Sequence, residues 1–349
     1  MSIHHNNIFK VIFNECVMAF ERKIDVYPFG YENEIRIVST GKTLETNSEL
    51  TAYIEETWKP KSEKGWKSSW IHIVTKINES RMINSPSDKL RFNIEAGAMT
   101  YAQTHGCLEA IKQGKPFAPK AINNLSIGII PITKDGYVIL SRRNPKLDHA
   151  GGVWNFNGGY MTSLLIDKAN CDNLDFINDL RLFDINEQLK RRIHRQEFYG
   201  LNEDDLDIGI GPNSLAFGFY HSLEMELGWV VIFNKTKNEM QEHIRYYEFQ
   251  GQKEHTETTY LTIEDLEELL LNQGDLLNEN PRTYNSKDPK KLILLDDNIG
   301  ELIGGSYSQI KKEFYESYKM DRKFVEPLKR KGLEINLKTN YHYEFPTSF

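Results

Sequence analysis

Residues 125–144, "LSIGIIPITKDGYVILSRRN", place two apolar runs on either side of the dipeptide Asp135-Gly136. Short apolar runs joined by an Asp-Gly turn predict a β-hairpin, because glycine accepts the positive φ that a tight turn needs. The second run ends in Arg142 and Arg143. Since side chains alternate along a strand, one of these two arginines is expected to face a pocket, where its guanidinium would suit a diphosphate.

A glycine pair follows the hairpin in residues 151–163, "GGVWNFNGGYMTS". We interpret Gly158 and Gly159, preceded by Asn157, as a place where the backbone approaches a phosphate or another element closely. Trp154 is expected to be a core anchor.

A helix is predicted further on, in residues 184–201, "DINEQLKRRIHRQEFYGL". Asp184 or Asn186 would cap its start, and Gly200 would end it. Its basic side chains, Arg192, His194 and Arg195, either form a solvated helix face or hold an anionic ligand.

The chain divides into three predicted parts, an α+β accessory domain at 1–122, a second domain at 123–320 and a tail at 321–349. In the first part, strands are predicted at "NEIRIVST", "WIHIVTKI" and "KLRFNIEAG", and helices at "NSELTAYIEETWKPK" and "TYAQTHGCLEAIKQG". In the second part, strands at "SLAFGFYHSL" and "GWVVIFNK" precede a helix at "TIEDLEELLLNQ".

Composition restricts the classes of function. The net charge of −7 and the pI near 5.9 argue against general binding to nucleic acid or to acidic membranes. Three widely separated cysteines indicate neither a disulfide framework nor a zinc site, and no apolar run approaches the roughly 18 residues of a spanning helix. We therefore expect a cytoplasmic protein with a small-molecule ligand, while its oligomeric state stays open, a homodimer included.

The order hairpin, tryptophan, Gly-Gly, loop and helix ending in Gly-Leu resembles the Nudix hydrolase family. Gly159 corresponds to the first glycine of the motif G-x5-E-x7-R-E-U-x-E-E-x-G-U, in which U is aliphatic, and "RRIHRQEFYGL" corresponds to its helix. The overall layout resembles the atypical animal branch that cleaves UDP-glucose and UDP-galactose. The resemblance implies an α/β/α sandwich with a mixed sheet, a nucleotide-derived ligand, and Mg²⁺ or Mn²⁺ held by carboxylates.

The sequence departs from the family motif in its acidic positions. Aligned on Gly200, only Glu197 remains of the three helix glutamates, and it is expected to be a metal ligand and catalytic carboxylate, with a solvent-facing glutamate as the alternative. The loop after Gly159 is about twenty residues longer than the motif allows. Glu224 and Glu226 alternate onto one face of a strand and are the expected replacement ligands and catalytic carboxylates. A solvated hairpin end is the alternative for this pair.

Two classes of function remain from the sequence. The first is a Mg²⁺-dependent hydrolase of the diphosphate in a nucleoside diphosphate derivative, with UDP-sugars favoured. The second is a binding module that has lost its carboxylates and senses a ligand such as ADP-ribose or a UDP-sugar.

Overall fold

The hairpin predicted around Asp135-Gly136 is present in the computed structural model of the protein. Strands β5 (Asn124–Thr133) and β6 (Val138–Arg143) pair antiparallel, and Gly136 has a φ of 86° at the turn. Every residue of β5 is buried, so this strand lies in the centre of the fold.

The structure describes residues 22–28, 34–81, 90–119, 122–147, 150–156, 158–161, 189, 201, 205–210, 214–218, 224–248, 255–314, 322–338 and 343–344. Their strands form one mixed sheet whose main order is β13-β1-β10-β11-β5-β3-β4-β2. Besides β5 and β6, the strands are β1 (Arg22–Pro28), β2 (Glu34–Thr43), β3 (Trp70–Arg81), β4 (Leu90–Thr100), β7 (Trp154–Asn155), β8 (Gly158–Tyr160), β9 (Leu206–Ile210), β10 (Ser214–Gly218), β11 (Glu224–Phe233), β12 (His255–Leu261), β13 (Leu333–Leu337) and β14 (Tyr343–Glu344).

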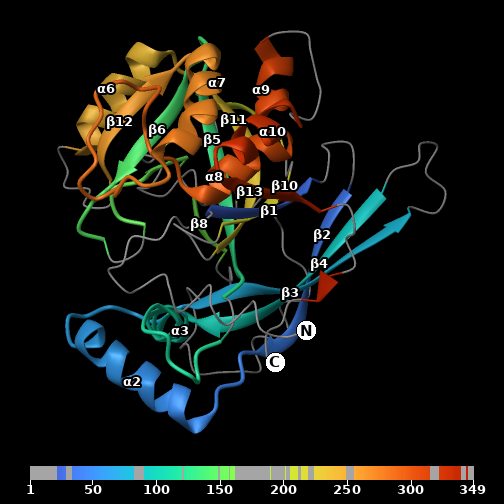
Figure 1. Ribbon diagram of the computed structural model, residues 1–349, viewed down its shortest axis with the longest axis vertical. Helices are drawn as coiled ribbons and strands as arrows, with labels where there is room; N and C mark the ends of the chain where they lie inside the picture. Colours follow the sequence, from blue (N-terminus) through green and yellow to red (C-terminus); the bar gives the residue numbers. More distant parts are fainter. Residues whose placement is uncertain are drawn as a thin grey trace.

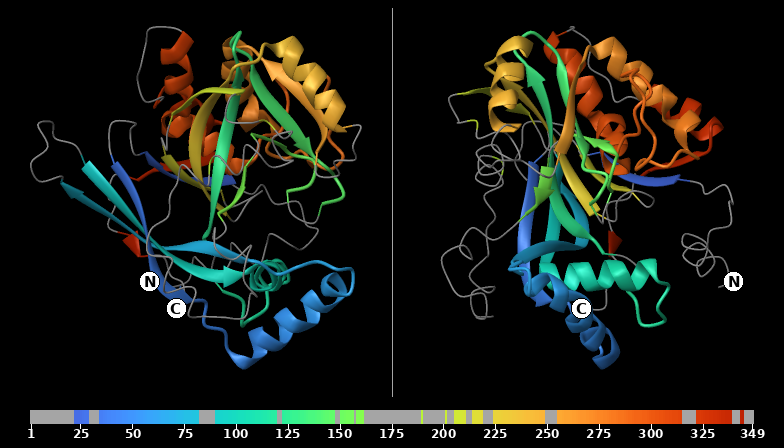
Figure 2. Two further views of the ribbon diagram at one scale, coloured as in Figure 1. Left: turned by 180° about the vertical axis from the view of Figure 1, so that it is seen from behind. Right: turned by 90° about the vertical axis from the view of Figure 1, so that its left-hand side faces the viewer.

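Helices cover both faces of the central strands (Figures 1 and 2). On one face, α6 (Lys237–Glu248) packs Met240 and Ile244 on β11 and β5. The opposite face carries four helices, α7 (Ile263–Asn272), α8 (Asp296–Glu301), α9 (Tyr307–Phe314) and α10 (Val325–Arg330). The protein therefore has a mixed α/β fold, in agreement with the predicted α+β class.

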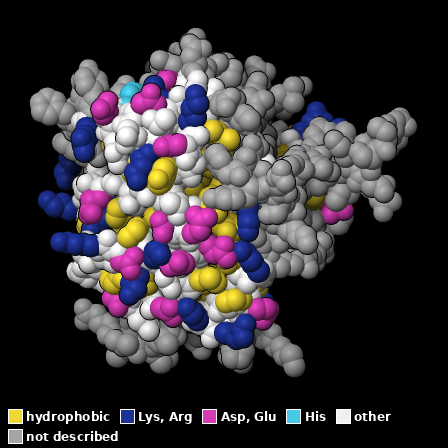
Figure 3. All heavy atoms as spheres, turned by 90° about the horizontal axis from the view of Figure 1, so that it is seen from above, with side chains coloured by type: hydrophobic (Ala, Val, Ile, Leu, Met, Phe, Trp, Pro, Cys, Tyr) yellow, Lys and Arg dark blue, Asp and Glu magenta, His cyan; other side chains and the backbone are white. Residues whose placement is uncertain are grey.

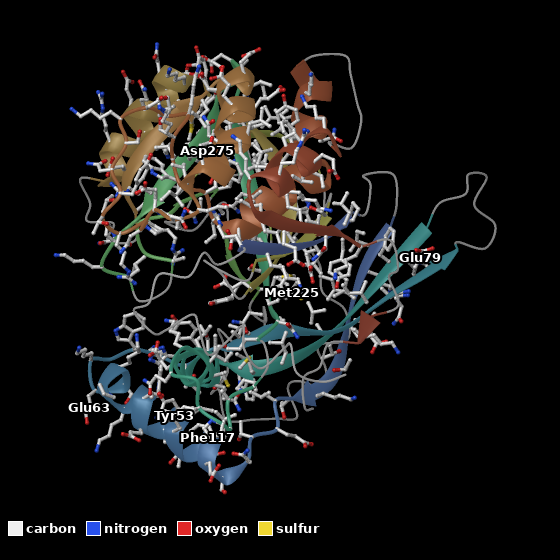
Figure 4. The ribbon with its side chains drawn as sticks, viewed as in Figure 1. Tyr53, Glu63, Glu79, Phe117, Met225 and Asp275 are labelled. Carbon is white, nitrogen blue, oxygen red and sulfur yellow. The ribbon has the colours of Figure 1, made fainter. Side chains whose placement is uncertain are left out.

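The N-terminal part extends the sheet with β3, β4 and β2 and carries α2 (Ser48–Ser62) and α3 (Tyr101–Lys112). Asn47 caps α2 through its side chain, and Thr100 forms a capping box at the start of α3. Tyr53 of α2 packs against Phe117, with ring centroids 5.6 Å apart (Figure 4). The strands and helices predicted for this part are thus confirmed.

The predicted parts share one sheet. β1, from the first part, pairs antiparallel with β10 and parallel with β13. β13 lies in the segment predicted as a tail, and its Leu333 and Ile335 are buried. The structure therefore places part of that segment in the core, because alternation along β13 directs these two side chains onto the helices of one face.

The surface seen from above mixes Lys and Arg with Asp and Glu over the described residues (Figure 3). No helix among the described residues is long and apolar enough to cross a bilayer. α6 was not anticipated from the sequence, because its polar face is wide and, of residues 237–245, only Met240 and Ile244 are buried.

His72 of β3 gives a first prediction, because it is 1% exposed and burial lowers its pKa from 6.5 to about 4. A depressed pKa means that the folded state resists protonation. The contribution to stability is therefore complete above about pH 6.5 and is lost as the pH falls towards 4, by roughly 3 kcal/mol in total. In urea unfolding at pH 7 and pH 4.5, His72→Gln should lose less stability than the wild type. Equal losses would contradict this assignment.

Candidate functional site

The central strands present an acidic side chain beside a row of glycines. β11 runs parallel to β5, with Glu226 next to Ser126 and Gly228 next to Gly128. On the other side of β5, β8 places Gly158 next to Gly128. Because side chains alternate, Glu226 and the three glycines belong to the same face of the sheet, the face that the helix α8 covers.

Helix α8 lies close against this face. A methyl group at Gly300 would lie only 2.7 Å from the Ala216 Cβ of β10, so glycine permits the close approach of helix and sheet. The segment that contains α8 delivers three polar side chains, Asp297, Asn298 and Glu301, that are all 0% exposed. These side chains lie against this face of the sheet, next to the three glycines.

The three glycines leave room for the carboxyl groups. A methyl group at Gly128 would overlap the Glu301 Oε1 and lie 2.8 Å from the Glu226 Oε1. One at Gly158 would overlap the same oxygen of Glu226, and one at Gly228 would lie 3.0 Å from the Glu301 Oε1. The carboxyls of Glu226 and Glu301 therefore occupy space that any other residue type would fill.

Asn298 holds these two carboxyls in place. The backbone N–H of Phe156 donates to the Asn298 Oδ1 at 2.9 Å, which turns the amide nitrogen towards the acids. Nδ2 then donates to the Glu226 Oε2 at 3.3 Å and to the Glu301 Oε2 at 3.1 Å. Each carboxyl keeps its other oxygen, Oε1, on the glycine side.

Burial makes the acids costly to ionise. It is the main cause that raises the pKa of Asp297 to about 7, and the charge of Glu224 adds to it. Burial also raises the pKa of Glu226 and of Glu301 well above the usual range, with the charge of Asp297 as the second cause for both. Glu226 and Asp297 share a hydrogen bond, which favours the protonated form of Glu226 and the ionised form of Asp297.

Glu224 and Tyr160 are half-buried and form the rim of this cluster, and Met225, which follows Glu224 on β11, marks its place in Figure 4. The Tyr160 hydroxyl donates to the Glu224 Oε1 at 2.6 Å. Burial raises the pKa of Tyr160 well above its usual value, the Glu224 charge adds to this, and the charge of Arg143 opposes it. The ring centroid of Tyr101, from α3, lies 6.1 Å from that of Tyr160, so the N-terminal part reaches the rim.

The two arginines of β6 have different surroundings. Arg142 is 6% exposed, and its guanidinium donates to the Glu257 Oε1 at 2.6 Å and to the carbonyl oxygens of Tyr284 at 2.7 Å and Gly152 at 3.3 Å. Arg143 is half-buried and acts electrostatically on the Tyr160 hydroxyl. By alternation, Arg142 follows Val138 and Leu140 on the sheet face of the acid cluster, whereas Arg143 is the arginine whose charge reaches Tyr160.

The structure brings together four of the residues predicted from the sequence, namely Glu224 and Glu226 on β11 and Gly158 and Gly159 on β8. Arg142 and Arg143 lie on β6 as described above, and the remaining predicted residues, Asn157, Arg192, His194, Arg195 and Glu197, lie outside the described residues. Leu189, in the first turn of the predicted helix, is helical and 8% exposed, as expected for its apolar side.

Sequence reasoning missed the acids of α8. The segment 292–304, "LILLDDNIGELIG", contains Asp297 and Glu301 four residues apart in an apolar environment, a spacing that places both on one helix face. Acidic residues at this spacing in an apolar run were the available signal. Asp296, next to them, pairs instead with Arg22 of β1.

These residues fit a hard divalent cation, which prefers carboxylate oxygens. The Glu301 Oε1 and the Asp297 Oδ2 are buried and accept no hydrogen bond from an N–H group of the described residues. As they stand, no three His, Cys, Asp or Glu side chains of the described part of the chain are arranged to hold a metal ion. Glu226 and Asp297 hydrogen-bond to each other, and a cation would replace that shared proton.

Comparison with known proteins adds no family assignment. No protein-family model matches the chain, and no curated protein sequence matches it. The chemistry of the site is therefore inferred from its geometry.

Proposed function

We propose that the protein is a Nudix-type hydrolase that cleaves the diphosphate of a nucleoside diphosphate derivative, with UDP-sugars as the favoured substrates. The products would be a nucleoside monophosphate and a phosphorylated second product. One observation carries the proposal: the carboxyl of Glu226 lies against the Gly158 backbone, so an acidic cluster adjoins the glycine pair expected at a diphosphate.

The arrangement of the fold supports the same proposal. A hairpin leads into the glycine pair, the sheet is mixed, and helices cover both of its faces, as the Nudix resemblance implies. Glu197, expected on the helix at 184–201, is outside the described residues. The part of the site assigned to β11, Glu224 and Glu226, is the part that the geometry supports.

Each described residue has a separate role in the proposal. Glu224 and Glu226 contribute carboxylates to Mg²⁺ or Mn²⁺, which when bound would neutralise the diphosphate and activate water. Tyr160 orients Glu224 through its hydroxyl hydrogen bond. Arg143 contacts the phosphate that leaves, because its side chain acts on the rim of the cluster.

The proposal is tested by incubating the purified full-length chain with UDP-glucose, UDP-galactose and ADP-ribose. Cleavage to UMP or AMP with Mg²⁺ or Mn²⁺, and none in excess EDTA, is the expected result. Complete recovery of all three compounds in the presence of either cation would reject hydrolysis of this substrate class.

A ligand-binding module is the second candidate, and one observation favours it. Glu226, Asp297 and Glu301 are 4%, 0% and 0% exposed, so little of the cluster faces solvent. A sensor of this kind would bind UDP-sugars or ADP-ribose without cleaving them. The ligand would then raise the melting temperature equally in EDTA and in Mg²⁺, and would be recovered intact.

The two arginines of β6 give a further prediction. Arg143→Ala should weaken binding of a UDP-sugar by roughly 1.5–3 kcal/mol, or about 10- to 100-fold, through a lost charged hydrogen bond. Arg142→Ala should leave binding nearly unchanged and lower the free energy of unfolding, because it removes the donors to Glu257 and to two carbonyls. Calorimetric titration and urea unfolding measure the two effects. Equal effects of both variants on binding would remove Arg143 from the site.

A further inference from the structure

We propose that Asp297 and Glu301 of α8, together with Glu226 of β11, bind a divalent cation between the helix and the sheet. The proposed function is needed only for the choice of Mg²⁺ or Mn²⁺, because the site itself follows from the described residues. It assigns a cation-binding role to α8, whose acids the sequence did not indicate.

The charge balance of the cluster is the first support. Three carboxyls converge where side chains are at most 4% exposed. Arg22, a buried arginine next to this segment, is bound to Asp296 and to the Leu294 carbonyl. Among the described residues, no Lys, Arg or His forms an ion pair with any of the three acids. Uncompensated buried carboxylates are strongly unfavourable, and a bound cation would compensate them.

An unpartnered oxygen is the second support. The Glu301 Oε1 is buried, accepts no hydrogen bond among the described residues, and is directed onto the Gly128 backbone beside the Glu226 Oε1. The Asp297 carboxyl accepts from the Asn298 N–H and shares a hydrogen bond with Glu226. Buried polar atoms normally have partners, so the Glu301 Oε1 indicates a missing ligand.

The glycine row is the third support. Gly158, Gly128 and Gly228 come from three strands and lie side by side in register. Methyl groups at any of them would meet the Glu226 or Glu301 carboxyl at 3.0 Å or less. A core that only needed neutral packing would accept alanine at one of these positions with a smaller residue on α8. The space next to these glycines is instead occupied by the carboxyl groups of Glu226 and Glu301.

Asn298 is a positioning residue in this site. Its Oδ1 is occupied by the Phe156 N–H, so only its N–H groups face the acids. They bind one oxygen of Glu226 and one of Glu301 and leave the other oxygen of each carboxyl for the cation. Binding would release the proton that Glu226 and Asp297 share.

The test measures Mn²⁺ binding by electron paramagnetic resonance, with the full-length chain first stripped by EDTA and no nucleotide present. The wild type should remove about one Mn²⁺ per chain from solution. Glu301→Gln should bind at least about 10-fold more weakly. Its amide oxygen can still accept the Asn298 hydrogen bond, so the fold should persist, and Asp297→Asn serves as a second variant with the same expected loss.

The matched control is Glu267→Gln on α7. Glu267 is also partly buried, but the Tyr307 hydroxyl and the Lys323 Nζ already satisfy it, so Mn²⁺ affinity should equal that of the wild type. Mn²⁺ should also raise the melting temperature of the wild type and of the control, and not that of Glu301→Gln.

The outcomes separate this inference from the proposed function. Absence of Mn²⁺ binding in the wild type, or unchanged affinity in both Glu301→Gln and Asp297→Asn, would overturn the inference. Unchanged Mn²⁺ affinity in Glu301→Gln and Asp297→Asn together with cation-dependent cleavage of UDP-glucose would overturn it and leave the hydrolase proposal standing. Mn²⁺ binding that is lost in the variants, without cleavage of any nucleotide, would support the inference and reject the hydrolase.

Discussion

Replacing Glu226 by glutamine is expected to reduce cation-dependent release of UMP from a UDP-sugar by at least about 100-fold. Glu226 is the one acid that belongs both to the predicted strand pair and to the cluster beneath α8. Its amide replacement keeps an oxygen that can accept the Asn298 hydrogen bond, and removes the negative charge that a cation needs.

The same substitution should not destabilise the protein in EDTA. Because the pKa of Glu226 is raised in the fold, the folded state holds its proton more tightly than the unfolded chain does. Stability from this group is therefore greatest at acidic pH and falls as the pH rises above the usual carboxyl range. Glu226→Gln lacks this loss, so its melting temperature in EDTA should fall less than that of the wild type between pH 5 and about pH 8.

Glu267→Gln is the control for activity as well as for stability, since that side chain lies on α7 with its own partners. Turnover within a factor of about two of the wild type is expected for it. Undiminished turnover in Glu226→Gln would remove Glu226 from the catalytic site, whatever the control shows.

Local signals explain what the sequence predicted correctly. The Asp135-Gly136 turn and the helices predicted at "NSELTAYIEETWKPK" and "TIEDLEELLLNQ" each depend on residues only a few positions apart, so a short stretch of sequence is enough to predict them. Glu224 and Glu226 were noticed for the same reason, because alternation on one strand is a local property.

Non-local contacts explain what the sequence did not indicate. Glu226 meets Asn298 and Glu301 only because α8 returns over the sheet more than seventy residues later. α8 has six residues, too few for a helical periodicity to be evident. β1 pairs with β10 and β13, which lie far from it in the sequence. Such pairings depend on the topology of the whole sheet and cannot be predicted from a short stretch of sequence.

A buried ion pair anchors the start of α8 to β1, and breaking it should have the largest effect on stability. Arg22 of β1 is 0% exposed, and its guanidinium donates to the Asp296 Oδ1 and, at 3.0 Å, to the Leu294 carbonyl. Arg22→Ala removes the guanidinium that pairs with the buried Asp296 carboxylate, which should cost about 3–5 kcal/mol in the free energy of unfolding. Urea unfolding at neutral pH measures this loss.

Two further variants distinguish a lost ion pair from lost packing. Lys331→Met removes the Lys331–Asp275 pair, whose side chains are 37% and 58% exposed, and should cost less than about 1 kcal/mol. The double variant Arg22→Met, Asp296→Leu replaces both charges by apolar groups and should recover most of the stability that Arg22→Ala loses. If Arg22→Ala cost no more than Lys331→Met, Asp296 would have to be neutral or hydrated in the fold.

The ion pair also bears on the cation site, because Asp296 adjoins Asp297. Loss of the ion pair in Arg22→Ala should therefore weaken Mn²⁺ binding as well. The pair that anchors α8 to β1 thus also positions the acids that α8 contributes.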